Sequence, residues 1–194
     1  MKKLGIPLLI FAVAACASES DAELANQAAL EAPATTEIEA APLPAVTDAQ
    51  IADIVLTANQ VDVDAGELAS ATSTNPEVQA FAERMITDHN GVNEAATELA
   101  TRLGVTPEAN PVSQQLRQGG EANLEALSAL SGAEFDSAYI AHEVTYHQAV
   151  LDALDNTLIP SAQNAELKAL LVSVRPAFVA HLEHAQQLQG SLAG

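Results

Sequence analysis

Five side chains that could bind a metal or transfer protons fall on faces that the sequence otherwise keeps apolar. At 100° per residue along a helix, Asp62, His89, Glu143, His147 and His181 lie within apolar stripes, whereas most other charged residues lie outside them. Imidazole nitrogens and carboxylate oxygens are ligands of divalent ions such as zinc, copper or iron. Since a buried charge or imidazole needs a partner or a metal, we expect these five residues to form a polar layer inside the fold.

Three interpretations of this layer remain open at the level of the sequence. The layer could hold a divalent transition metal, it could be a hydrogen-bonded layer that only fixes helix register, or the residues could be less buried than expected. A di-iron centre does not fit, because such centres use a Glu-x-x-His motif on two helices, and no carboxylate stands three residues before His89 or His181. The sequence also lacks a Gly-x-Ser-x-Gly turn and a phosphate-binding loop, so it favours a protein that is not an enzyme.

Helical periodicity supplies the elements that must position these residues, and no segment alternates as a strand would. Thr47-Asp48 and Asn75-Pro76 are typical helix starts, and Gly104 is a typical helix end. The sequence predicts helical segments at residues 47–72, 76–103, about 113–130, about 133–158 and from after Ser161 to about 189, with short turns at 73–75 and 159–161. Two long hairpins joined by one long connection predict an all-α fold, a ferritin-like four-helix bundle over residues 47–190 with a short extra helix in the crossover between helices two and three.

Several motifs around these positions resemble a known family. They are the run from Asp62 to Ala69, Met85-x-x-Asp88-His89, Phe135-Asp136-x-x-Tyr139, Glu143-x-x-x-His147 and His181. Together they resemble domain-of-unknown-function family 4142 over about residues 47 to 189. The resemblance implies a ferritin-like exported protein with no assigned activity. This chain departs from the usual family pattern by having Asp62 in place of Glu and Glu143 where Gln is common.

The first residues predict export and lipidation. Lys2-Lys3, a short apolar run and small residues before Cys16 have the pattern of a signal peptide over residues 1–16, and Val13 to Cys16 resembles a lipobox. By resemblance to proteobacterial lipoproteins, Ala17 after the cysteine favours an outer-membrane lipoprotein that faces the periplasm. Residues 17–46 contain no basic residue and are rich in Ala, Glu and Pro, so we expect a disordered acidic tether.

The charge of the chain restricts its partners. The formal net charge is −19, which disfavours nucleic acid and anionic lipid as ligands. The leading prediction is a non-enzymatic module in the bacterial cell envelope, attached to the membrane through lipid on Cys16 and involved in envelope or stress-related interactions with other envelope proteins. The alternative is a domain that binds or sequesters zinc, copper or iron through the five buried residues.

Overall fold

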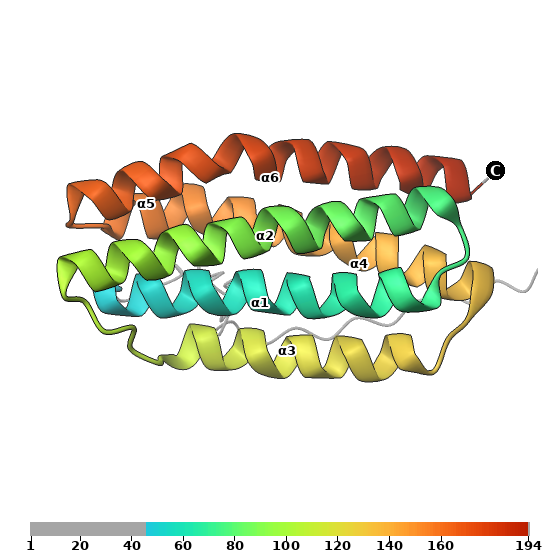
Figure 1. Cartoon of the computed structure of the whole chain (residues 1–194), viewed down its shortest axis with the longest axis horizontal. Helices are drawn as coiled ribbons and strands as arrows, with labels where there is room; N and C mark the ends of the chain where they lie inside the picture. Colours follow the sequence, from blue (N-terminus) through green and yellow to red (C-terminus); the bar gives the residue numbers. More distant parts are fainter. Residues whose placement is uncertain (1–45, 194) are drawn as a thin grey trace, which may run out of the picture. The chain divides into compact units, whose positions relative to one another are not determined.

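A computed structural model describes residues 46–193, and this part of the chain is a bundle of long helices without strands (Figure 1). The helices are α1 (Asp48–Thr72), α2 (Pro76–Leu103), α3 (Pro111–Ser128), α4 (Gly132–Ala153), the π-helix η1 (Leu154–Leu158), α5 (Ile159–Ser161) and α6 (Ala165–Leu192). The prediction of an all-α bundle is confirmed. The predicted signal peptide, Cys16 and nearly all of the predicted tether lie outside the described residues.

Local sequence explains where the helices begin and end. The Thr47 hydroxyl accepts a hydrogen bond from the Gln50 amide, and the Gln50 side chain accepts one from the Thr47 amide, which makes a capping box before α1. Asn75 caps α2 ahead of Pro76. Gly104 ends α2 with φ of 65°, a left-handed conformation that glycine adopts without steric cost.

The bundle consists of two helical hairpins and a crossover helix. α1 packs along α2, and α4 packs along α6. α3 runs the length of the bundle against α1, so that α2 and α4 point in the same direction (Figure 1). This connection places all four long helices around a shared interior.

The apolar core is divided into two clusters. One includes Ile51, Leu99, Leu154 and Leu171, and the other includes Phe81, Met85, Phe135, Tyr139 and Ala185. Along α1, α2 and α4, the residues of one cluster precede the predicted polar residues and those of the other follow them. The five polar positions therefore lie between two apolar halves.

The second hairpin differs from the sequence prediction in its turn. Residues 159–161 were expected to form the turn, but the chain remains helical through η1 and α5 to Ser161. The turn falls at Ala162–Asn164 because the Asp48 carboxylate accepts hydrogen bonds from the Gln163 and Asn164 amides, both at 2.9 Å. Asn164 then caps α6. The crossover helix also begins slightly earlier than predicted, at Pro111 after the Asn110 cap.

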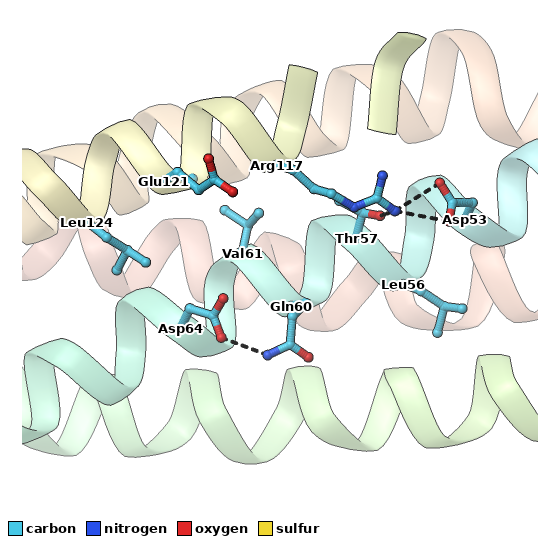
Figure 2. A pocket seen from close by; sticks show the side chains of 10 residues that line it. Asp53, Leu56, Thr57, Gln60, Val61, Asp64, Arg117, Glu121 and Leu124 are labelled. Carbon is cyan, nitrogen blue, oxygen red and sulfur yellow. Dashed lines mark hydrogen bonds and ion pairs between the residues drawn. The ribbon is translucent and has the colours of Figure 1, made fainter. Parts of the chain in front are cut away.

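Two contacts hold α3 against α1 beside a surface pocket (Figure 2). Arg117 of α3 donates hydrogen bonds to both carboxylate oxygens of Asp53, at 3.1 and 3.2 Å, and to the Thr57 hydroxyl at 2.9 Å. Further along α3, Gly120 is buried against Val61 of α1. The charge of Arg117 is thus already neutralised within this pocket.

The close approach at Gly120 predicts opposite effects for two adjacent substitutions. A Cβ at Gly120 would lie 2.8 Å from Val61 Cγ2, whereas a Cβ at Gly119 would meet nothing within 4 Å. We expect Gly120→Ala to destabilise the protein by about 1–3 kcal/mol through overpacking. Gly119→Ala should stabilise it by up to about 1 kcal/mol through helix propensity. Thermal denaturation of the pair checks this, and a higher melting temperature in both variants would contradict the packing described here.

A helix that crosses a bilayer needs about 20 predominantly apolar residues. None of the helices within residues 46–193 is long and apolar enough to cross a bilayer.

Candidate metal centre

The structure brings all five predicted residues together in the interior of the bundle. Asp62 is on α1, His89 on α2, Glu143 and His147 on α4, and His181 on α6. None of the five is more than 3% exposed. They form a cluster to which every long helix of the two hairpins contributes, and we call it the buried cluster.

The three imidazoles of the buried cluster form a nearly equilateral triangle. The ring centroids are 5.5 Å apart for His89 and His147, 5.3 Å for His89 and His181, and 5.4 Å for His147 and His181. One nitrogen from each ring lies within 4.8 Å of the other two. Ligand atoms of Asp62, Glu143 and His147 are equally close to one another, so His147 belongs to both groups.

Asp62 lies against two of these rings without a hydrogen bond. Its Oδ2 atom is 3.2 Å from His89 Nε2 and 3.6 Å from His147 Nε2, but neither contact has hydrogen-bond geometry. Two atoms bound to one metal at about 2.0–2.1 Å in a tetrahedral site are separated by roughly 3.4 Å. Each of these two spacings is therefore that of a pair of ligands of one ion, and the group of mutually close ligand atoms that includes Asp62 is completed by Glu143 and His147.

Hydrogen bonds to Asn59 determine which nitrogen of His89 carries the proton. The Asn59 Nδ2 group donates to the Val55 carbonyl at 2.8 Å, so the Asn59 Oδ1 atom faces His89 Nδ1 at 2.7 Å. Because Oδ1 can only accept, Nδ1 carries the hydrogen. The lone pair of His89 is consequently on Nε2, the atom that faces Asp62.

The other two histidines are held in the same manner. His147 Nδ1 donates to the Glu143 carbonyl at 3.1 Å and lies 3.4 Å from the Glu143 carboxylate, which leaves the Nε2 lone pair toward Asp62. His181 Nε2 donates to Asp88 Oδ2 at 2.8 Å, which leaves its Nδ1 lone pair buried. Metal-binding histidines usually donate their second ring N–H to an oxygen in this way.

The buried cluster consequently contains ring nitrogens without hydrogen-bond partners. His89 Nε2, His147 Nε2, His181 Nδ1 and both carboxyl oxygens of Asp62 are buried and make no hydrogen bond with the described residues, while the buried Tyr139 hydroxyl lies against the Glu143 carboxyl. Buried polar atoms are normally hydrogen-bonded, and those that are not require an explanation. A cation would satisfy this donor set, so the residues present fit a bound metal.

Burial shifts the pKa values of the cluster toward uncharged side chains. It raises the pKa of the Asp62 carboxyl well above its usual range, with a further increase from Glu143, and it raises the pKa of Glu143 to about 8. It lowers the pKa of His89 to about 2 and that of His181 to about 4, although Asp88 opposes the change at His181. The His89 and His181 imidazoles are therefore neutral near pH 7, the form that binds metals, and a cation would displace protons from the carboxyls.

These shifts predict how the stability of the metal-free protein depends on pH. Between the unfolded pKa of about 4.5 and the folded pKa of about 8, Glu143 binds more protons in the folded state, so the free energy of unfolding falls as pH rises. His89 and His181 act in the opposite direction, because unfolded histidines are still half-protonated at pH 6.5 and lose these protons by about pH 8. We expect a net loss of about 1 kcal/mol between pH 6.5 and 8.

Chemical denaturation of the metal-free protein across this range measures the loss. The Glu143→Gln variant is the control, because a neutral amide removes the titrating group and should make the dependence shallower. Stability that is constant or increases from pH 6.5 to 8 would contradict a buried protonated Glu143.

Three contributors to the cluster were not assigned a role from the sequence. Asn59 orients His89, Asp88 orients His181, and the Phe178 ring stacks on His89 at 4.9 Å between centroids. In the sequence, Asp88 stood out only as part of the Met-x-x-Asp-His motif. Its side chain is 38% exposed and also forms an ion pair with Arg84. Neither Asn59 nor Phe178 has a spacing that would have identified it.

Comparisons with known proteins give a family and a fold. A family model described as "Domain of unknown function (DUF4142)" matches residues 32–188. A solved structure titled "CopM in the Cu(II)-bound form" is similar, with a TM-score of 0.60 and 17% sequence identity, and the match covers 75% of this chain and 97% of that one. At this identity the likeness shows the fold alone. No curated protein matches the chain.

Proposed function

The chain belongs to the DUF4142 family, whose description assigns no activity. We propose, from the geometry of the buried cluster, that this cluster binds a divalent transition metal ion. His89, His147 and His181 would supply three nitrogens and Asp62 an oxygen. Glu143 would act mainly as the outer partner of His147. The protein would sequester the ion in the bundle interior.

The observation that carries this proposal is the set of three buried ring nitrogens that make no hydrogen bond, while an oxygen accepts from the other nitrogen of each ring. A layer that only fixed helix register would be expected to satisfy its own hydrogen bonds, because each unsatisfied buried group costs about 1–3 kcal/mol. Here the outer nitrogens of the three rings are hydrogen-bonded while the inner nitrogens are not. The arrangement supports three oriented ligands and argues against the register-only interpretation.

The donor set favours copper(II) among the common ions. Magnesium and calcium bind oxygen ligands, whereas imidazole suits zinc, copper, iron and nickel. For a given site of nitrogen and oxygen ligands, affinity among divalent first-row metals is highest for Cu²⁺. The similar fold of CopM, solved in its Cu(II)-bound form, supports this choice.

Elemental analysis of the full, tag-free chain tests the proposal. We expect close to one equivalent of Cu(II) after loading and dialysis, and a higher melting temperature, because an ion that binds only the folded state stabilises it. Magnesium should cause neither effect. Less than about 0.1 equivalent of any transition metal, with no shift on adding zinc, copper or iron, would remove the proposal and favour a module that acts only through protein contacts.

We also propose that the bundle is exported and held at the outer membrane, on its periplasmic side, by lipid on Cys16. The support is the charged, apolar and small-residue pattern that precedes this single cysteine. Two or three acyl chains bind a membrane far more tightly than one. Labelled palmitate should be incorporated into the wild-type protein and absent from the Cys16→Ser variant; label retained in that variant would overturn the assignment.

A further inference from the structure

An apolar cavity lies beside the buried cluster and shares Asp62, His89 and His147 with it. Its volume is about 180 Å³, and the surface that its wall exposes is apolar, although Asn59 and Asp62 are among the lining residues. Residues from α1, α4, η1 and α6 form most of the wall, and the rings of His89, His147 and Phe178 close the end next to the cluster. The three shared residues of the buried cluster expose no polar atom to this space, so a ligand here would meet only apolar surface.

The cavity adjoins the surface of the bundle on the side of α3 and α4. A groove on that side of the bundle shares Val112, Leu116 and Tyr146 with the cavity. α3 packs closely on α1 but only lightly on α4, and Val112 is 39% exposed. A molecule at the surface could therefore enter the cavity without separating α1 from its neighbours.

The backbone next to the cavity departs from regular α-helix. Leu154 and Leu158, the first and last residues of the π-helix η1, both line the cavity. Short π-helical segments occur often at functional sites. The π-helix η1 therefore lies directly beside the cavity in the apolar core.

The apolar wall and the acidic charge of the chain indicate the polarity and the charge of the ligand. A wall without polar atoms offers no hydrogen bond, and an apolar cavity of about 150 Å³ in another protein stays dry and binds benzene or xenon. Four of the five basic residues that the structure describes, Arg84, Arg102, Arg117 and Arg175, are already paired with carboxylates. A carboxylate head group would find no such partner in this acidic chain.

From these observations we propose that the cavity binds an uncharged, compact apolar molecule about the size of a substituted benzene ring. The rings of Phe178, Tyr146 and His147 in the wall favour an aromatic ligand, because aromatic pairs gain from edge-to-face contact. This function is separate from metal binding and does not require an ion.

Benzene and toluene titrations of the metal-free full chain test the proposal. We expect saturable binding by calorimetry and a rise in melting temperature with either compound. Ala58→Leu places a larger side chain in the cavity and should weaken binding at least tenfold. Ala71→Leu, at an exposed position on the same helix, should leave it unchanged.

A second variant keeps the test decisive if Ala58→Leu does not fold. Val150→Ala enlarges the cavity at a half-buried position of its wall and should admit naphthalene, which the wild-type protein should reject. Absence of saturable benzene and toluene binding in the wild-type protein would overturn the proposal. Tighter binding of octanoate than of benzene would also overturn it, since the ligand would then be anionic.

Discussion

His147→Ala is expected to abolish stoichiometric Cu(II) binding, with a loss of affinity of about 100-fold or more. His147 is the only residue that belongs to both groups of close ligand atoms, and its Nε2 lone pair faces the Asp62 carboxylate. Loss of an outer hydrogen-bond partner typically costs 10- to 100-fold in metal affinity, so loss of a direct ligand should cost at least as much.

Competitive titration against a chelator of known affinity measures this change. His142→Ala is a matched control, because His142 is on the same helix but outside both groups of ligand atoms. The control should bind Cu(II) as the wild-type protein does. Equal losses in the two variants would mean that copper binds surface histidines and not the buried cluster.

Asp62→Asn is expected to weaken Cu(II) binding by about 100-fold, for the same reason, and to stabilise the metal-free protein. The Asp62 carboxylate is buried and accepts no hydrogen bond from the described residues. Where the Asp62 carboxyl is ionised, an amide in its place would remove a buried charge and could donate to the lone pair of His89 Nε2, now 3.2 Å from Asp62 Oδ2. A hydrogen bond of this kind is worth about 1 kcal/mol.

The opposite signs of these two effects distinguish a ligand from a structural residue. Asp64→Asn is the control: Asp64 is on the same helix and accepts a hydrogen bond from Gln60, and it is outside the ligand groups. It should change neither property by much. If Asp62→Asn lowered the melting temperature of the metal-free protein, the carboxylate would be part of a satisfied structural network.

The position of the buried cluster is expected to lower the stability of the metal-free protein. It separates two apolar clusters that would otherwise form one continuous core. A buried polar group is tolerated when it is paired, and replacing such groups by apolar ones is often stabilising. We therefore interpret the cluster as a feature retained for binding at the expense of stability.

Much of the fold and of the cluster could be predicted because both depend on helical periodicity. Capping at Thr47 and Asn75, and the left-handed end at Gly104, were visible from residue type. Asp62, Glu143 and the three inward histidines stood out because each interrupts an apolar stripe. A polar residue in such a stripe has to be buried if the helix packs through that face.

The remaining features depend on contacts between segments far apart in sequence. Asp88 reaches His181 across 93 positions, and Asp48 holds the turn at Gln163 across 115. Neither partner could be chosen from a helical pattern, because both acidic residues have the spacing expected of solvent-exposed positions. The end of the second hairpin was therefore misplaced, and the role of Asp88 was not foreseen.

Electron paramagnetic resonance of the full chain loaded with one equivalent of Cu(II) tests the central claim most directly. Bound histidine nitrogens split the copper signal, so we predict nitrogen hyperfine structure in the wild-type protein from His89, His147 and His181. The variant in which all three are alanine should instead give the spectrum of loosely bound copper. An unchanged spectrum in that variant would show that the buried cluster does not bind the ion.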